Sequence, residues 1–100
     1  MLEVKVRVPP RADLSGADRM VERCCANEGL TMTVRRSLRM SEDNVHWHFR
    51  KEGERGTLEI ALLRAERGIS LYIHDNRRGS WIPSTIRRLK PAIERGLKSE

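Results

Sequence analysis

The sequence is poor in aromatic residues and has no long apolar segment. Aromatic side chains make up 4% of its 100 residues, so aliphatic side chains and methionine must supply most of the surface that a core buries. No stretch approaches the roughly 20 apolar residues that a membrane-spanning helix needs, and residues 1–10 lack the uninterrupted apolar run of a secretory signal. We therefore expect a cytoplasmic protein with no membrane partner.

Cysteine is also scarce. The only two cysteines, Cys24 and Cys25, are adjacent in the sequence, which is a poor geometry for a mutual disulfide. They lack the C-x-x-C spacing of redox and zinc sites. The simplest role for both is that of small apolar side chains in a reducing compartment, and no motif in the chain predicts a metal or another cofactor.

Positive charge is in excess. Lysine and arginine total 20 against 14 acidic residues, which gives a formal net charge of +6. Clustered cations attract phosphate groups through an electrostatic effect that does not depend on base sequence. The surplus favours an anionic partner, with RNA or DNA as the first candidate. The competing interpretation is a basic surface that is simply solvated and binds no partner.

The periodicity of apolar residues predicts five strands and two helices. Residues 2–8 alternate without error between apolar and charged side chains, which is the pattern of a half-buried strand. A helical spacing follows and ends at Gly29, and a second one begins after Ser80, with a kink or break expected at Pro91. The other predicted strands are residues 30–40, 45–51, 57–63 and 69–75.

The resulting order is strand, helix, four strands, helix, in one domain that covers residues 1–100. Each strand has one apolar face and both helices are amphipathic, so the elements can form two layers around one core. We predict an α+β two-layer sandwich, in which two helices cover one face of a five-stranded, mainly antiparallel sheet (order β-α-β-β-β-β-α). This order resembles one half of the saddle of a TATA-box-binding protein and also the small helix-grip folds. The resemblance is topological and implies no function.

Two histidines and a carboxylate are expected to meet on the uncovered face of the sheet. The strand at residues 45–51 should turn Trp47 and its alternate neighbours inward, which leaves His46 and His48 on the uncovered face. A hairpin then places His48 opposite Glu59. The next strand offers Glu59 one of two further neighbours, Tyr72 or His74.

This row of polar side chains has three interpretations. An exposed pair of histidine and glutamate across two strands is a common surface contact, and this is the interpretation that we favour. Imidazole and carboxylate are also ordinary ligands of zinc and related metals. The third interpretation is acid and base catalysis, for which we expect Glu59 to raise the pKa of His48. That chemistry needs a concave pocket, which a flat sheet lacks.

A nucleic-acid interpretation uses cations and one aromatic ring on the same face. The strand at residues 30–40 alternates so that Arg35 and Arg39 face outward, while Arg36 intrudes on the apolar side. A bulge there, or a position where the strand extends past its partner, would let Arg36 reach water. Outward cations bind backbone phosphate, and an exposed ring stacks on a base. The residues predicted for this interface are Lys5, Arg7, Arg35, Arg39, Arg50 and Tyr72.

Arg77 and Arg78 lie shortly before the second helix. Free backbone amides at a helix N-terminus attract anions, and two guanidinium groups would add to that attraction. The competing interpretation is a turn followed by a helix cap at Ser80, and we favour it. Trp81, just inside the helix, is expected to anchor the core.

The leading functional hypothesis is a small, non-enzymatic binding module for an anionic partner, with nucleic acid as the first class. One alternative is a small-molecule or metal-dependent activity centred on His48 and Glu59. Another is a homo-oligomeric accessory protein whose exposed sheet edges pair between subunits.

Overall fold

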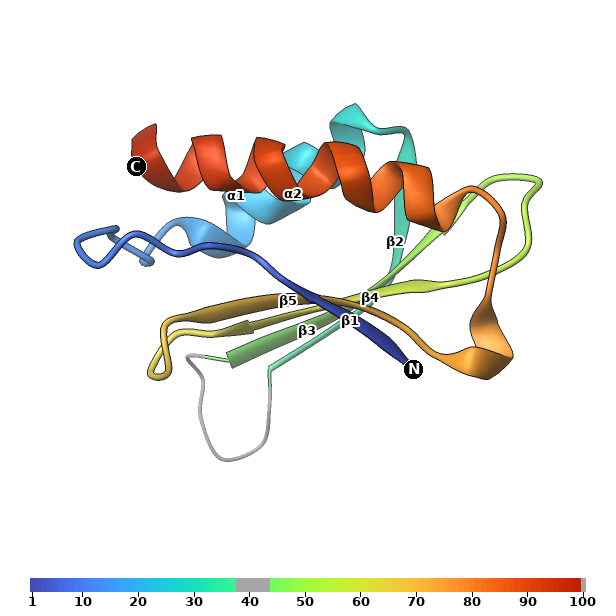
Figure 1. The fold of residues 1–100 in the computed structure, drawn as a ribbon, viewed down its shortest axis with the longest axis horizontal. Coiled ribbons are helices and arrows are strands. Elements are labelled where there is room, and N and C mark those ends of the chain that lie inside the picture. Colours follow the sequence, from blue (N-terminus) through green and yellow to red (C-terminus); the bar gives the residue numbers. More distant parts are fainter. Residues whose placement is uncertain (38–43, 100) are drawn as a thin grey trace.

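The computed structural model describes residues 1–37 and 44–99, and its helices and strands follow the predicted order. Five strands form one sheet, and two α-helices form a second layer on one of its faces (Figure 1). This arrangement confirms the predicted α+β sandwich. The elements are β1 (Leu2–Lys5), α1 (Ala17–Asn27), β2 (Leu30–Ser37), β3 (Asn44–Lys51), β4 (Leu58–Leu63), β5 (Gly68–Ile73), a 3-10 helix (Asp75–Arg77) and α2 (Ile82–Ser99).

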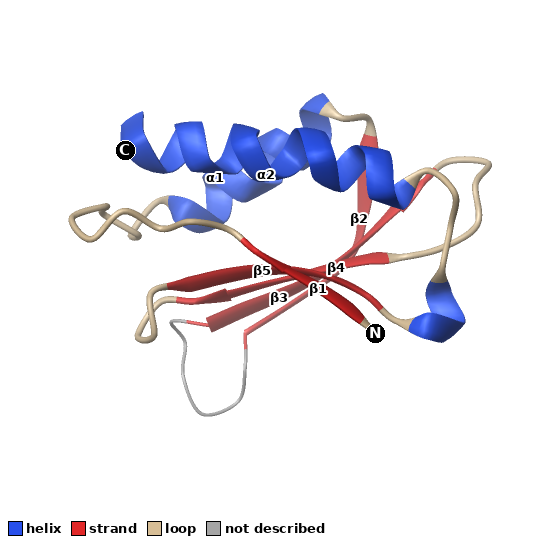
Figure 2. Cartoon of the chain, in the orientation of Figure 1, coloured by secondary structure: helices blue, strands red, loops and turns tan. Residues whose placement is uncertain are grey.

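The strands lie in the order β1-β5-β4-β3-β2, and each pair of neighbours is antiparallel. The three strands in the middle are joined in chain order, whereas β1 and β2 form the two edges of the sheet. The chain passes from one edge to the other through α1, in the helical layer (Figure 2). One face of the sheet therefore lies under both helices, and we call the opposite side the open face.

The apolar alternation of β3 builds the centre of the core. Trp47 is fully buried and Val45 and Phe49 are nearly so. The indole N–H of Trp47 donates a hydrogen bond of 2.9 Å to Glu22 on α1, which places this side of β3 under the helices. The inward direction predicted for Trp47 is thus confirmed. Trp81 is also buried, as expected, and donates its indole N–H to the carbonyl oxygen of Arg55.

The helix α2 continues from Ile82 to Ser99 through Pro91, so the expected break is absent. Pro91 lies on the exposed side, where water can satisfy the carbonyl group that loses its hydrogen bond. Leu89 and Ile93 on the buried side hold the helix on the sheet at both sides of the proline. Among the residues that the structure describes, no helix combines the length and apolar character needed to cross a bilayer.

The strand β2 departs from the predicted alternation. Its register against β3 shifts between Met32 and Val34, so the bulge lies at Thr33 and not at Arg36. A bulge adds one residue and reverses which side chains face the helices beyond it. Arg35 consequently lies opposite Trp47 and pairs with Asp18 and Glu22 of α1. The prediction that Arg35 faces outward is wrong, and Arg36 takes that place.

Candidate functional site

Two rows of residues cross the open face at the middle of the sheet. In one row His48 pairs with Glu59, as predicted, and Glu59 pairs with Tyr72. In the other row His46 lies opposite Ala61. Glu59 thus lies on the central strand β4, next to the strand β3 that carries His46 and His48. The hairpin between β3 and β4 sets this register.

Three imidazole rings converge on the carboxylate of Glu59. The Nε2 atoms of His46 and His48 lie 3.0 and 3.2 Å from its Oε1 atom. The Nε2 atom of His74 lies 3.0 Å from its Oε2 atom. Tyr72 is therefore the strand partner of Glu59, while His74 is its side-chain partner. These contacts leave Glu59 only 4% exposed, although it lies on the face that the helices do not cover.

Arg77 determines where His48 carries its proton. The Nη1 atom of Arg77 lies 3.3 Å from Nδ1 of His48 and 3.9 Å from Oε2 of Glu59. A guanidinium group only donates hydrogen bonds, so Nδ1 of His48 must accept this one. The proton of the neutral ring is then on Nε2, where it faces Oε1 of Glu59.

Burial lowers the pKa of His48 below its ordinary value of 6.5. Glu59 acts in the opposite direction, while His46 and Arg77 add to the lowering. The carboxylate does act to raise this pKa, as expected, but the net shift is downward because desolvation of the imidazole outweighs attraction to one anion. His48 is neutral at physiological pH, which is the state that a metal ligand needs.

His46, His48 and Glu59 have the spacing of a metal-ligand set. One ligand atom from each lies within 4.8 Å of the other two. Ligands of a tetrahedral zinc ion, each about 2.0 to 2.1 Å from the metal, lie about 3.3 Å from one another. The nitrogen-to-oxygen distances of 3.0 and 3.2 Å are close to that value. Replacing the two ring protons by a cation thus needs little movement of these side chains.

A polar pocket adjoins His48 on the open face. It encloses a volume of about 480 Å³ between the sheet, the β3–β4 hairpin and the segment around the 3-10 helix. The expected flat surface is therefore hollowed by two loops. The lining residues are Thr33, His48, Arg50, Gly56, Thr57, Asn76 and Arg77.

Backbone contacts hold the two loops of this pocket together. The amide N–H of Thr57 donates to the carbonyl oxygen of Arg77 at 2.9 Å. Gly79 packs so closely on Arg55 that a Cβ atom at position 79 would overlap the Arg55 carbonyl oxygen. The hydrogen bond from Trp81 to that same carbonyl adds a third contact. The walls of the pocket are thus fixed by the fold.

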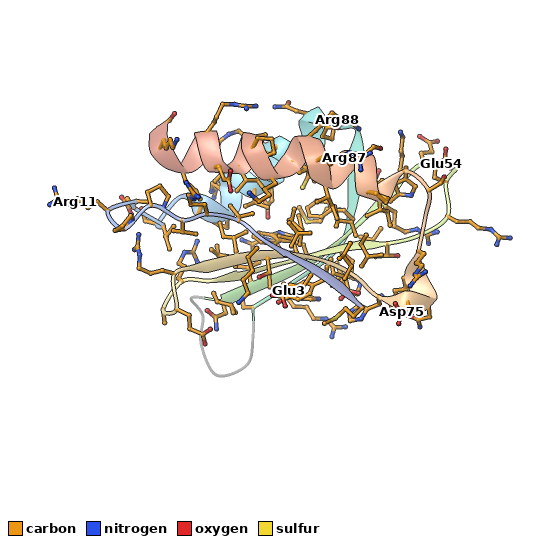
Figure 3. The ribbon with its side chains drawn as sticks, in the orientation of Figure 1. Glu3, Arg11, Glu54, Asp75, Arg87 and Arg88 are labelled. Atoms are coloured by element: carbon orange, nitrogen blue, oxygen red, sulfur yellow. The ribbon has the colours of Figure 1, made fainter. Side chains whose placement is uncertain are left out.

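The predicted cations are spread over different parts of the molecule. Lys5 pairs with Ser70 on the open face, and Arg50 is exposed and lines the pocket. Arg7 lies beyond β1, and its backbone N–H donates to Glu94 of α2. Arg39 lies outside the described residues. In Figure 3, Glu3 of β1 lies on the opposite side of the sheet from Arg87 and Arg88 of α2, so the open face also carries an acidic side chain.

Arg77 and Arg78 do not act as a pair at the start of α2. The side chain of Arg77 reaches back to His48, whereas Arg78 pairs with Asp75. The helix begins only at Ile82. The sequence did not reveal Thr33 and Thr57 as pocket residues, because the pocket depends on how the loops pack. It also did not reveal the outward position of Arg36, because that position depends on the bulge in β2.

No protein-family model, curated protein or solved structure shows a significant match to this chain. What the domain does is therefore inferred from the chemistry of its side chains.

Proposed function

We propose that this domain binds a divalent transition metal through His46, His48 and Oε1 of Glu59. The observation that supports this most directly is the meeting of two imidazole Nε2 atoms at one buried carboxylate oxygen, within 3.2 Å. Imidazole and carboxylate together suit zinc, cobalt, nickel or copper, whereas calcium and magnesium favour sites built of oxygen alone.

His74 has a different role in this proposal. Its Nε2–H donates to Oε2 of Glu59, which leaves Oε1 directed toward the other two histidines. A hydrogen bond of this kind orients a ligating carboxylate, and its loss typically weakens metal affinity by about 10- to 100-fold. His74 is therefore a positioning residue rather than a third imidazole ligand.

Titration with cobalt(II) tests the proposal, because its visible absorption reports the number and kind of ligands. We expect a saturable site in the native protein, loss of binding in Glu59→Gln, and weaker binding with an unchanged spectrum in His74→Gln. Glu54→Gln is the matched control, since Glu54 is an exposed residue of the neighbouring hairpin. Equal cobalt binding by the native protein and Glu59→Gln, or no binding by the native protein, would contradict the proposal.

An anionic macromolecule is a second candidate partner. Lys5, Arg36 and Arg50 are all exposed on the open face, and cations on a sheet suit the backbone of RNA or DNA. In this proposal the domain is a binding module rather than an enzyme.

Pairing of the edge strands β1 and β2 between two copies is a separate proposal, tested by sedimentation at several concentrations.

A reducing, cytoplasmic location fits the cysteines. Cys25 is buried in the core and Cys24 is partly buried, and both thiols are free. Burial raises the pKa of both thiols, which disfavours the reactive thiolate. Structural thiols of this kind are compatible with the cytoplasm, and localisation of a tagged protein in its own cell tests the assignment.

A further inference from the structure

We propose that the pocket beside His48 binds the phosphate group of an anionic ligand between Arg50 and Arg77, and that metal binding strengthens this interaction by releasing Arg77 from His48. The second half of the proposal rests on the proposed metal site. The first half stands on the pocket alone.

The pocket is built for negative charge. Arg50 and Arg77 supply two guanidinium groups, and among the described residues that line it none is acidic. The guanidinium group of Arg50 has no ion-pair or hydrogen-bond partner within residues 1–37 and 44–99, so its donors are available. Arginine presents a planar fork of donors that matches the oxygens of phosphate. Two such groups in one hollow favour a phosphate monoester over a neutral ligand.

The size of the pocket fits a small molecule rather than a bare ion. Its volume of about 480 Å³ falls in the range of ligand-binding pockets, roughly 300 to 1,000 Å³. A phosphate group occupies only part of that space, so the remainder can hold an organic group such as a nucleoside. The hydroxyl of Thr57 and the side chain of Asn76 supply polar contacts for it.

The hydrogen bond between Arg77 and His48 couples the pocket to the metal site. A cation on Nε2 of His48 forces the ring proton onto Nδ1, where it faces the donor group of Arg77. Two donors repel each other, and the metal adds further positive charge beside a guanidinium only 3.9 Å from Glu59. The side chain of Arg77 is 44% exposed, so it is free to turn toward the pocket and Arg50.

Linkage makes this coupling reciprocal. If the metal raises the affinity for a phosphate ligand, the ligand must raise the affinity for the metal by the same factor. Removing Arg77 should therefore have opposite effects on the two ligands. It should weaken phosphate binding and, by removing a competing cation, strengthen metal binding.

Calorimetry with adenosine monophosphate, with adenosine as the uncharged control, tests the pocket. We expect the native protein to bind the monophosphate and not adenosine. Arg50→Ala and Arg77→Ala should each weaken that binding by about tenfold. Arg78→Ala is the matched control, because Arg78 is the exposed neighbour that pairs with Asp75 outside this pocket. An equal loss of affinity for the monophosphate in all three variants would mean that the ligand responds only to the overall positive charge, and it would overturn the proposal.

Repeating the titration with the protein saturated by zinc tests the coupling. We expect affinity for the monophosphate to rise by about fivefold or more in the native protein and to stay unchanged in Arg77→Ala. An equal rise in both proteins would assign the effect to the metal charge alone and overturn the release of Arg77.

The outcomes separate the two proposals. Zinc binding without monophosphate binding removes the pocket proposal and leaves the metal site. Monophosphate binding that depends on Arg50 and Arg77, without any zinc binding, removes the metal site and the coupling and leaves the pocket. A parallel titration with a single-stranded RNA distinguishes the source of the phosphate. RNA binding that depends on both arginines supports the pocket, and RNA binding that is indifferent to them contradicts an RNA source.

Discussion

Arg35 and Trp47 donate hydrogen bonds to the same oxygen atom, Oε2 of Glu22. The distances are 2.7 Å from Nε of Arg35 and 2.9 Å from the indole nitrogen of Trp47. A residue on the edge strand β2 and a fully buried residue of β3 therefore share one acceptor on α1. This acceptor joins the sheet to the helical layer.

Replacing Arg35 and Arg36 one at a time tests the bulge in β2. Arg35→Ala removes one partner from each of Asp18 and Glu22, and we expect it to lower the free energy of unfolding by about 1 kcal/mol, the upper end for partly exposed ion pairs. Arg36→Ala should change it by less than about 0.5 kcal/mol, because a surface substitution of this kind breaks no such network. Urea denaturation of both variants measures the difference. The reverse ranking would mean that Arg36 lies under the helices.

Replacing Trp47 tests the centre of the core. Trp47→Ala leaves a large cavity and removes one of the two hydrogen bonds to Oε2 of Glu22, so we expect the free energy of unfolding to fall by about 3 to 5 kcal/mol, enough to unfold much of a small domain. Trp47→Phe should lose less, because the ring volume is partly kept and only the indole N–H disappears. Circular dichroism during thermal unfolding measures both. Near-native stability of Trp47→Ala would contradict the burial of this side chain.

Metal addition should stabilise the fold. A ligand at about a hundred times its dissociation constant adds about 2.7 kcal/mol to the free energy of unfolding when it binds only the native state. For a domain of this size we expect the melting temperature to rise by more than about 10 °C with zinc and to return after a chelator is added. Differential scanning calorimetry measures the shift. A shift of the same size in Glu59→Gln would mean that zinc binds elsewhere.

Glu94 should contribute to stability against acid. A hydrogen bond from Lys90 and another from the backbone N–H of Arg7, both 2.8 Å, lower the pKa of Glu94 below its ordinary value of 4.5. Its ionised form therefore stabilises the native state above about pH 4.5, and this contribution disappears as the pH falls through the lowered pKa.

The variant Glu94→Gln should be less stable than the native protein at pH 7 and should lose less stability on acidification. Glu54→Gln, which changes an exposed carboxylate, is the control. Unfolding in urea between pH 3 and pH 7 gives the comparison. If stability falls in parallel with pH in the native protein and Glu94→Gln, protonation of Glu94 is not coupled to unfolding and the prediction is wrong.

The three middle strands were predictable from the sequence because each alternates without interruption and is joined by a short loop. Once Trp47 was assigned to the core, the outward direction of His46, His48 and Glu59 followed from the two-residue period of a strand. The same period does not distinguish Tyr72 from His74, because both face outward. The structure resolves this by giving Glu59 one as a strand partner and the other as a side-chain contact.

The departures arose where contacts between distant segments decide the conformation. The bulge at Thr33 turns Arg35 toward acids on a helix that precedes the strand, and no local pattern in β2 records those acids. Arg77 turns back to His48 because its backbone is tied to Thr57. The local sequence of that loop resembles the start of a helix, and this pattern predicts neither the contact of Arg77 with Thr57 nor its contact with His48.

Gly79 is none of the residues proposed to contact metal or phosphate, yet it sets how closely the segment that carries Arg77 approaches the β3–β4 hairpin. A methyl group there would collide with backbone at Arg55 and with the indole of Trp81, separating the hairpin from the segment that carries Arg77. A mutational screen scored by ligand affinity would consequently flag Gly79 alongside Arg50. Only a measurement of loop geometry would reveal that the glycine acts as a spacer and the arginine as a contact.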